Sequence, residues 1–263
     1  IYELDPATYS DLYSGSPVIA WIDGADTVAN WSIYGNSYLS PVGFFPISNR
    51  ESRDEFFYYS YEATFVTRDT SLKIQSTIYT PKDLPDSCNF VFQRLKITSA
   101  DGATHSGLAI GEAIDWDIPS DSGLRNGSGF NTADKTIWQY GGEYGQDDAT
   151  ECQDNDLRSG GLLFLSMRKG GNDLSATAPY GAYTADNATW VYGNDYGFEP
   201  SEIYARMVAP SGFQIYESGN PDSVYTDLHM VMTFAANMTI GPIDTLTIWS
   251  AMITVENSST GPT

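Results

Sequence analysis

Two aspartates, Asp115 and Asp117, are the residues of this chain whose type and spacing most readily suggest chemistry. They stand two positions apart, where an apolar, strand-like run passes into a loop rich in Gly, Ser and Asn. On an extended chain, side chains two positions apart point to the same face. Because like charges at that distance repel each other, a cation, a hydrogen-bond network or solvent has to compensate them.

Calcium is the cation that would suit this loop, because Ca²⁺ is bound by oxygens from carboxylates, amides, backbone carbonyls and water. The candidate ligands are Asp115, Asp117, Asp121, Asn126 and Asn131, and a second acidic cluster lies at 147–156. Neither segment has the EF-hand pattern or the calcium-binding nonapeptide pattern. The alternative is a solvated acidic loop with Asx-turns, which the same composition allows.

Carboxylates could also hydrolyse glycosidic bonds, which requires two carboxyl groups at a defined separation. Glu112, Asp115 and Asp117 lie close together, but no pattern marks one as the acid and another as the base. The histidines are His105, in a turn, and His229, at a mid-strand position more typical of packing; no Gly-X-Ser-X-Gly sequence occurs. A carbohydrate-active hydrolase using carboxylates near 112–117 is therefore the alternative to a non-catalytic role.

Aromatic residues suggest that the chain could bind sugars without catalysis. Trp116, Trp138, Tyr140 and Tyr144 lie in or near the long polar segment 115–160. Their rings could stack on sugar rings while Asp and Asn side chains bond the hydroxyl groups. The alternative is that these rings pack beneath the loops, as most aromatic side chains do.

The net charge of −21 narrows the range of partners. With 13 Lys and Arg against 34 Asp and Glu, too few basic residues are available for a patch that neutralises phosphates. This argues against nucleic-acid binding, and the same sign disfavours anionic membrane surfaces. No apolar run approaches the roughly 20 residues of a membrane span, so we expect no membrane insertion. The chain begins at Ile1, as expected of a processed or excised piece.

Cys88 and Cys152 are the two cysteines, and neither has a metal-binding spacing. Each stands beside polar turn residues in a chain that is acidic and rich in Tyr and Asn. We therefore expect one disulfide between them and an extracellular or cell-surface location, where conditions are oxidising. Two unrelated free thiols are the alternative.

Strand patterns dominate the chain. The runs 56–67 and 72–80 flank Arg68-Asp69-Thr70-Ser71 and predict a hairpin, while 89–98 and 106–114 flank an Asp-Gly turn signal at 100–102. Further strands are expected at 17–22, 135–140, 161–167, 188–192, 224–234 and 243–255. The last run is apolar on both faces, which predicts a central strand rather than an edge strand.

Helix signals are confined to 200–208, where Pro200 stands at an allowed first position, and to one turn at 5–9. Strands and helices do not alternate, which disfavours a parallel α/β fold. The predicted fold is all-β: a large antiparallel β-sandwich, at its largest a supersandwich, with long acidic loops and one or two short helices. We expect a single domain over 1–256 and a linker-like Ser/Thr/Gly/Pro tail at 257–263.

The run GEAIDWDIPSDS at 111–122 resembles a motif of large, secreted bacterial β-domains found in long exported or cell-surface proteins. The segments DSCNF at 86–90 and DSVY at 222–225, together with the strand at 245–255, add to the resemblance, which covers most of the chain from about residue 60 onward. This group is functionally uncharacterised. The resemblance implies export and a non-catalytic module, and it transfers no catalytic residue.

The sequence thus predicts a non-catalytic extracellular structural or binding module of a secreted or cell-surface bacterial protein. Its expected partner is a glycan, bound through the acidic, aromatic loop region, or neighbouring protein subunits in a self-assembled surface structure. In such an assembly, a segment such as 1–4 would pair with the sheet edge of a neighbour. Ca²⁺ is the one cofactor expected.

Overall fold

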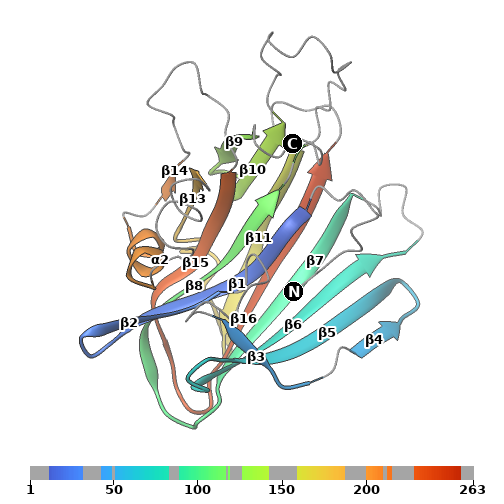
Figure 1. The fold of residues 1–263 in the computed structure, drawn as a ribbon. Helices are drawn as coiled ribbons and strands as arrows, with labels where there is room; N and C mark the ends of the chain where they lie inside the picture. Colours follow the sequence, from blue (N-terminus) through green and yellow to red (C-terminus); the bar gives the residue numbers. More distant parts are fainter. Residues whose placement is uncertain are drawn as a thin grey trace.

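The computed structural model describes residues 12–31, 43–48, 51–82, 89–116, 118, 126–141, 159–186, 200–209, 212–214 and 228–255. These residues form two β-sheets that lie one over the other, with one short helix outside them (Figure 1). Of the strand pairs described, only β13 with β14 is parallel. The predicted all-β antiparallel sandwich is therefore confirmed.

The larger sheet has ten strands. In spatial order they are β3 (Phe44–Pro46), β5 (Tyr58–Thr67), β6 (Leu72–Pro81), β7 (Phe90–Ser99), β16 (Thr245–Val255), β11 (Ser159–Lys169), β10 (Thr136–Gly141) and β9 (Asn126–Asn131), while β4 (Glu51–Asp54) pairs with β5 and β12 (Asn172–Asp173) with β11. β16 lies between β7 and β11, which confirms the central position that its two apolar faces predicted.

The smaller sheet has six strands. In spatial order they are β14 (Gly212–Gln214), β13 (Gly181–Asp186), β15 (Leu228–Ile240), β8 (His105–Trp116), β1 (Leu12–Asp23) and β2 (Asp26–Asn30). β2 pairs with β1 only from Ile19 onward, so in the described structure the first half of β1 forms the edge of this sheet.

The main core lies between the two sheets. Alternate residues of a strand point to the same face, so each strand contributes every second side chain to this core. Leu72 and Ile74 of β6 belong to the same buried cluster as Ile110 and Ile114 of β8. Burying each such side chain stabilises the fold by about 1.5–3 kcal/mol.

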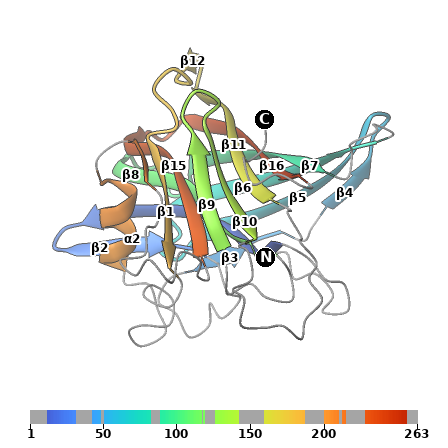
Figure 2. The ribbon, with the colours of Figure 1, turned by 90° about the horizontal axis from the view of Figure 1, so that it is seen from above.

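Helix α2 (Pro200–Met207) covers the face of the smaller sheet that points away from the larger sheet (Figure 2). Ile203 and Met207, one turn apart, are buried there in a second apolar cluster. Glu202 in the first turn and Arg206 in the last turn complement the helix dipole. The helix predicted at 200–208 is thus confirmed. In the described part of the chain, no helix is long and apolar enough to cross a membrane.

Both predicted turns are present, but they connect strands differently. β5 and β6 pair as the predicted hairpin. The Asp101-Gly102 turn also forms, with Gly102 at φ 76°, yet the strands it joins, β7 and β8, lie in different sheets. A turn signal is local and does not determine which strands pair. Cys88, Cys152, the strand predicted at 188–192 and the tail 257–263 lie outside the described residues.

Candidate functional site

The predicted calcium ligands lie only partly within the described residues. Asp117 and Asp121 lie outside them, and Asn126 begins β9. Asn131 ends β9, and its side-chain oxygen accepts a hydrogen bond from the N–H of Ala133 at 2.9 Å, as in an Asx-turn. In the part of the chain that the structure describes, no three His, Cys, Asp or Glu side chains lie close enough together to hold a metal ion. Calcium binding by this loop stays a prediction.

Asp115 is 2% exposed, and its register partner on the adjacent strand β15 is His229. The rings of Trp31 and Tyr183 meet the His229 ring edge-on, with centroids 6.0 and 6.5 Å away. Burial, and secondarily the charge of Arg206, lowers the pKa of His229 to about 3, so the ring is neutral at physiological pH. His229 is therefore a packed side chain, as its mid-strand position indicated.

Glu112 and Asp115 point to opposite faces of the smaller sheet, because they are three positions apart on one strand. Glu112 faces the larger sheet, where its carboxyl meets Gln93 of β7. Asp115 faces the other way, on the side that α2 covers. Two carboxyl groups separated by a sheet cannot act on the same glycosidic bond, so this pair does not support a hydrolase.

Glu112 is a carboxyl group inside the apolar core, 1% exposed. Nε2 of Gln93 donates to its Oε1 at 3.3 Å, and Oε2 has no partner among the described residues. Ser250 in turn donates to Oε1 of Gln93 at 3.2 Å. Burial raises the pKa of Glu112 to about 8, against the opposing effect of the Gln93 hydrogen bond, so the carboxyl is mostly protonated at neutral pH.

A cavity of about 310 Å³ opens beside Glu112, between the edge of the smaller sheet and the larger sheet. Its lining is largely apolar and includes Phe44, Phe65 and Tyr61. Glu112 was one of the candidate carboxylates in the sequence, but the cavity beside it could not be predicted, because β1, β3, β5 and β8 meet only in the fold.

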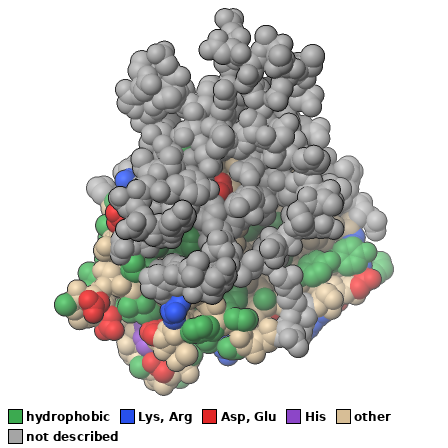
Figure 3. All heavy atoms as spheres, viewed as in Figure 1, with side chains coloured by type: hydrophobic (Ala, Val, Ile, Leu, Met, Phe, Trp, Pro, Cys, Tyr) green, Lys and Arg blue, Asp and Glu red, His purple; other side chains and the backbone are tan. Residues whose placement is uncertain are grey.

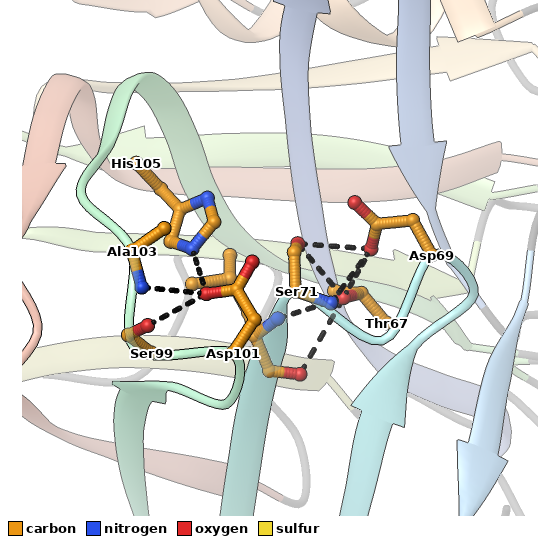
Figure 4. Close-up of polar contacts among 8 residues, drawn as sticks. Thr67, Asp69, Ser71, Ser99, Asp101, Ala103 and His105 are labelled. Atoms are coloured by element: carbon orange, nitrogen blue, oxygen red, sulfur yellow. Dashed lines mark hydrogen bonds and ion pairs between the residues drawn. The ribbon is translucent and has the colours of Figure 1, made fainter.

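His105 takes part in a turn and not in a catalytic triad (Figure 4). Nε2 of His105, the hydroxyl of Ser99 and the N–H of Ala103 all contact the same oxygen of Asp101, at 2.9, 3.0 and 2.8 Å. In a triad the histidine would bond the nucleophile on one side and the acid on the other. Here both side chains meet the acid, so the contacts stabilise the turn between β7 and β8. Asp69 closes the neighbouring β5–β6 turn in a similar way.

The aromatic residues singled out in the sequence separate into two environments. Trp116 is 3% exposed and lies over Gly160, inside the core. Trp138 and Tyr140 are half-buried and lie over Gly129 and Gly127, which have no side chain to block them. Tyr144 lies outside the described residues. Trp138 and Tyr140 share the outer face of the larger sheet, the face turned away from the smaller sheet.

Four residues form a straight row across that outer face. Glu62 of β5, Thr77 of β6, Arg94 of β7 and Trp249 of β16 are successive register partners. Nη2 of Arg94 donates to the Thr77 hydroxyl at 3.1 Å and lies 3.9 Å from Oε2 of Glu62. Gln75 donates to Oε1 of Glu62 at 2.8 Å. A guanidinium and a carboxylate are thus held in fixed positions on an open sheet surface.

Aromatic rings border this row. Tyr79 stacks on Trp249 with centroids 5.4 Å apart and planes inclined by 28°, and Tyr58 meets Tyr79 edge-on at 5.3 Å. The guanidinium carbon of Arg94 lies 5.4 Å from the Tyr79 centroid and 5.6 Å from that of Trp249. Burial raises the pKa of Tyr79, so its hydroxyl remains an uncharged hydrogen-bonding group.

Charged residues line two depressions on the outer face. One, of about 220 Å³, is lined by Arg53, Glu55, Tyr58, Ser60, Glu62, Thr77, Tyr79 and Arg94. The other, of about 230 Å³, is lined by Thr64, Lys73, Gln75, Lys96, Thr98 and Thr245. Four basic side chains thus gather on one face of a chain whose net charge is −21. We name this surface, from β4 to β16, the basic aromatic face.

Sequence reasoning missed the basic aromatic face, although one signal for it was available. In the strand 89–98, Arg94 and Lys96 alternate with the buried Leu95 and Ile97, so both basic side chains point away from the core. The rest of the face could not be found in this way, because its members come from strands as distant in sequence as β5 and β16.

Comparisons with known proteins add little to this description. No protein-family model matches the chain, and no curated protein matches it. Among solved structures, the chain is similar to part of a bacterial glucoamylase complexed with acarbose, with a TM-score of 0.43 and 11% sequence identity. The match covers 95% of this chain and 27% of that chain, so this chain spans about a quarter of the length of the glucoamylase. A likeness at this level carries no conclusion about function.

Proposed function

We propose that this chain is a non-catalytic extracellular binding module that binds a carboxylate-bearing glycan on its basic aromatic face. The observation that carries the proposal is the cross-strand row Glu62–Thr77–Arg94–Trp249, with the Tyr79 ring stacked at its end. Rigid aromatic rings offer apolar faces to sugar rings, and fixed polar groups bond hydroxyls.

The charge of the face favours an acidic sugar. Arg53, Lys73, Arg94 and Lys96 line its two depressions, and arginine pairs with carboxylates through two parallel hydrogen bonds. The −21 charge of the whole chain repels an acidic ligand at long range. At physiological ionic strength, however, this repulsion is screened beyond about 8 Å, so the nearby basic side chains dominate.

The extracellular location rests on the sequence. The acidic composition, the expected Cys88–Cys152 disulfide and the resemblance to secreted bacterial β-domains all favour export. A hydrolase acting through 112–117 has less support, because Glu112 and Asp115 face opposite sides of their sheet.

Affinity electrophoresis tests the proposal. The wild type should be retarded in gels containing polygalacturonate more than in gels containing dextran, and Trp249→Ala should abolish the difference. Phe57→Ala removes an exposed aromatic ring from the β4–β5 turn and serves as the control. Equal retardation of Trp249→Ala and the wild type would refute the site. Stronger retardation by single-stranded DNA than by polygalacturonate would refute the ligand class.

A second candidate function, self-assembly, is favoured by one further observation. Phe56 and Phe57, in the turn between β4 and β5, are 85% and 74% exposed, and Tyr59 and Tyr61 of β5 are exposed beside them. Figure 3 shows hydrophobic side chains along this edge of the larger sheet. Exposed apolar groups of this kind favour contact with another protein surface. Sedimentation of the wild type and Phe56→Ser across a concentration series would reveal an assembly through this edge.

A further inference from the structure

The cavity beside Glu112 is a site separate from the basic aromatic face. Its outer end is lined by Pro46 and Ser48, which are exposed, and its inner end by Gln93 and Glu112, which are buried. It lies beside the first half of β1, which β2 does not reach in the described part of the chain, while the larger sheet continues past that edge with β3 and β5. At about 310 Å³ it lies at the lower end of the volumes of small-molecule sites.

Glu112 lines the inner end of the cavity, and one of its carboxyl oxygens makes no hydrogen bond to a described residue. Oε2 of Glu112 is fully buried and has no hydrogen-bond partner among the described residues, while Gln93 holds Oε1. A buried polar group without a partner costs free energy, and a buried lone carboxylate costs more. Such a group in a cavity marks a position where a ligand can supply what the protein lacks.

The lining identifies the kind of ligand. The described residues that line the cavity include no Lys, Arg or His side chain. Glu62, the other acidic residue of the lining, has its carboxylate bonded to Gln75 and Thr77 on the outer face. The rings of Phe44, Phe65 and Tyr61 can surround an apolar body or the face of a cation. The net charge of −21 attracts cations and repels anions.

We propose that this cavity binds a small organic amine, whose ammonium group pairs with the Glu112 carboxylate and whose apolar body lies among Phe44, Phe65 and Tyr61. Binding ionises Glu112: its proton leaves to solvent, and the carboxylate then accepts hydrogen bonds from the ammonium group. The ligand thus satisfies Oε2 and compensates the buried charge at the same time.

Calorimetric titration with phenethylamine at pH 7, in two buffers of different ionisation enthalpy, tests the proposal. The wild type should bind the amine and release close to one proton per ligand. 2-Phenylethanol, of the same shape but uncharged, should bind at least tenfold more weakly, and phenylacetate should not bind. Two results would overturn the assignment in favour of a neutral ligand. One is that the alcohol binds as tightly as the amine, and the other is that the amine binds without releasing a proton.

Two variants keep the test independent of folding defects. Glu112→Gln should bind the amine at least tenfold more weakly than the wild type does. Glu202→Gln, which removes an exposed carboxylate on α2, should bind it like the wild type. Ala63→Leu fills the cavity from β5 and leaves Glu112 in place, and it should also prevent binding. If both Glu112→Gln and Ala63→Leu bind phenethylamine as the wild type does, or if the wild type binds none at millimolar concentration, the cavity is not an amine site.

Discussion

Gln93 of the larger sheet donates a hydrogen bond to Glu112 of the smaller sheet across the apolar core, with 3.3 Å between Nε2 and Oε1. Both side chains are almost completely buried. A core of this size gains more stability from an apolar side chain than from a buried carboxyl group that has a hydrogen bond on only one oxygen. Proteins tolerate such costs mainly at functional positions, which is why we assign Glu112 to a binding site and not to the scaffold.

The first prediction is that Glu112→Gln stabilises the unliganded protein. The folded state raises the pKa of Glu112 from 4.5 to about 8, so between these values the folded state holds a proton that the unfolded state has released. The free energy of unfolding of the wild type therefore falls as pH rises through this window, by up to about 1.4 kcal/mol per pH unit. A glutamine has no such dependence, and its advantage at pH 8 should be on the order of 2–4 kcal/mol.

Urea denaturation of both proteins at pH 5 and pH 8 measures this difference. Glu202→Gln, on the exposed surface of α2, controls for the loss of one negative charge. If the stability difference between Glu112→Gln and the wild type is the same at both pH values, the pKa of Glu112 is not raised in the folded state.

The second prediction concerns Gly160, which lies directly beneath the Trp116 ring in the core. A β-carbon at this position would overlap the ring, so Gly160→Ala should destabilise the fold by about 1–3 kcal/mol. Gly171→Ala is the matched control, because nothing lies within 4 Å of its β-carbon. Thermal or urea unfolding provides the measurement, and equal stabilities of the two variants would contradict this packing.

The third prediction concerns acid stability at the β7–β8 turn. Hydrogen bonds from the N–H of Ala103 and from His105 and Ser99 lower the pKa of Asp101 to about 2. The stabilisation is present above the usual pKa of an aspartate, 3.8, and is lost as pH falls toward 2. Asp101→Asn should therefore be less stable than the wild type at pH 5, and most of this gap should be lost by pH 2. A gap that stays constant from pH 5 to pH 2 would contradict the lowered pKa.

Much of the fold could be predicted from the local pattern of apolar and polar residues along the chain. The run 243–255 has apolar residues on both faces and is the central strand β16, and 56–80 forms the predicted β5–β6 hairpin. The order of strands could not be predicted, because it depends on pairings between segments far apart in the chain. The Asp101-Gly102 turn shows this limit: its residues predict the turn, but not that β7 and β8 enter different sheets.

The sites were less accessible to sequence reasoning than the fold. Alternation places Glu112 and Asp115 on opposite faces of a strand, but it does not say which face meets the other sheet. Trp116 resembled a candidate sugar-binding ring, and its burial over Gly160 depends on how β8 lies against β11. Likewise, Arg94 and Trp249 become neighbours only through the register between β7 and β16.

The fourth prediction concerns calcium and the acidic loop. If Asp115, Asp117 and Asp121 bind Ca²⁺, free calcium at ~100 times its dissociation constant should stabilise the fold by about 2.7 kcal/mol. Asp117→Asn should weaken this response, which a melting curve with and without chelator would show. Magnesium at the same concentration is the control, because any divalent cation screens a net charge of −21. Equal stabilisation by magnesium, unchanged in Asp117→Asn, would mean that the loop has no specific calcium site.

The most direct measurement of the central claim is a calorimetric titration of the wild type, Arg94→Gln and Arg206→Gln with tetragalacturonate at physiological ionic strength. Arg94 lies in the basic aromatic face between Thr77 and Trp249, while Arg206 is exposed on α2 at the opposite side of the molecule. We predict that the wild type and Arg206→Gln bind alike, that Arg94→Gln binds at least tenfold more weakly, and that maltotetraose, which has no carboxylates, binds weakly to all three. Equal affinity of Arg94→Gln and the wild type, or no binding of tetragalacturonate by the wild type, would contradict the account.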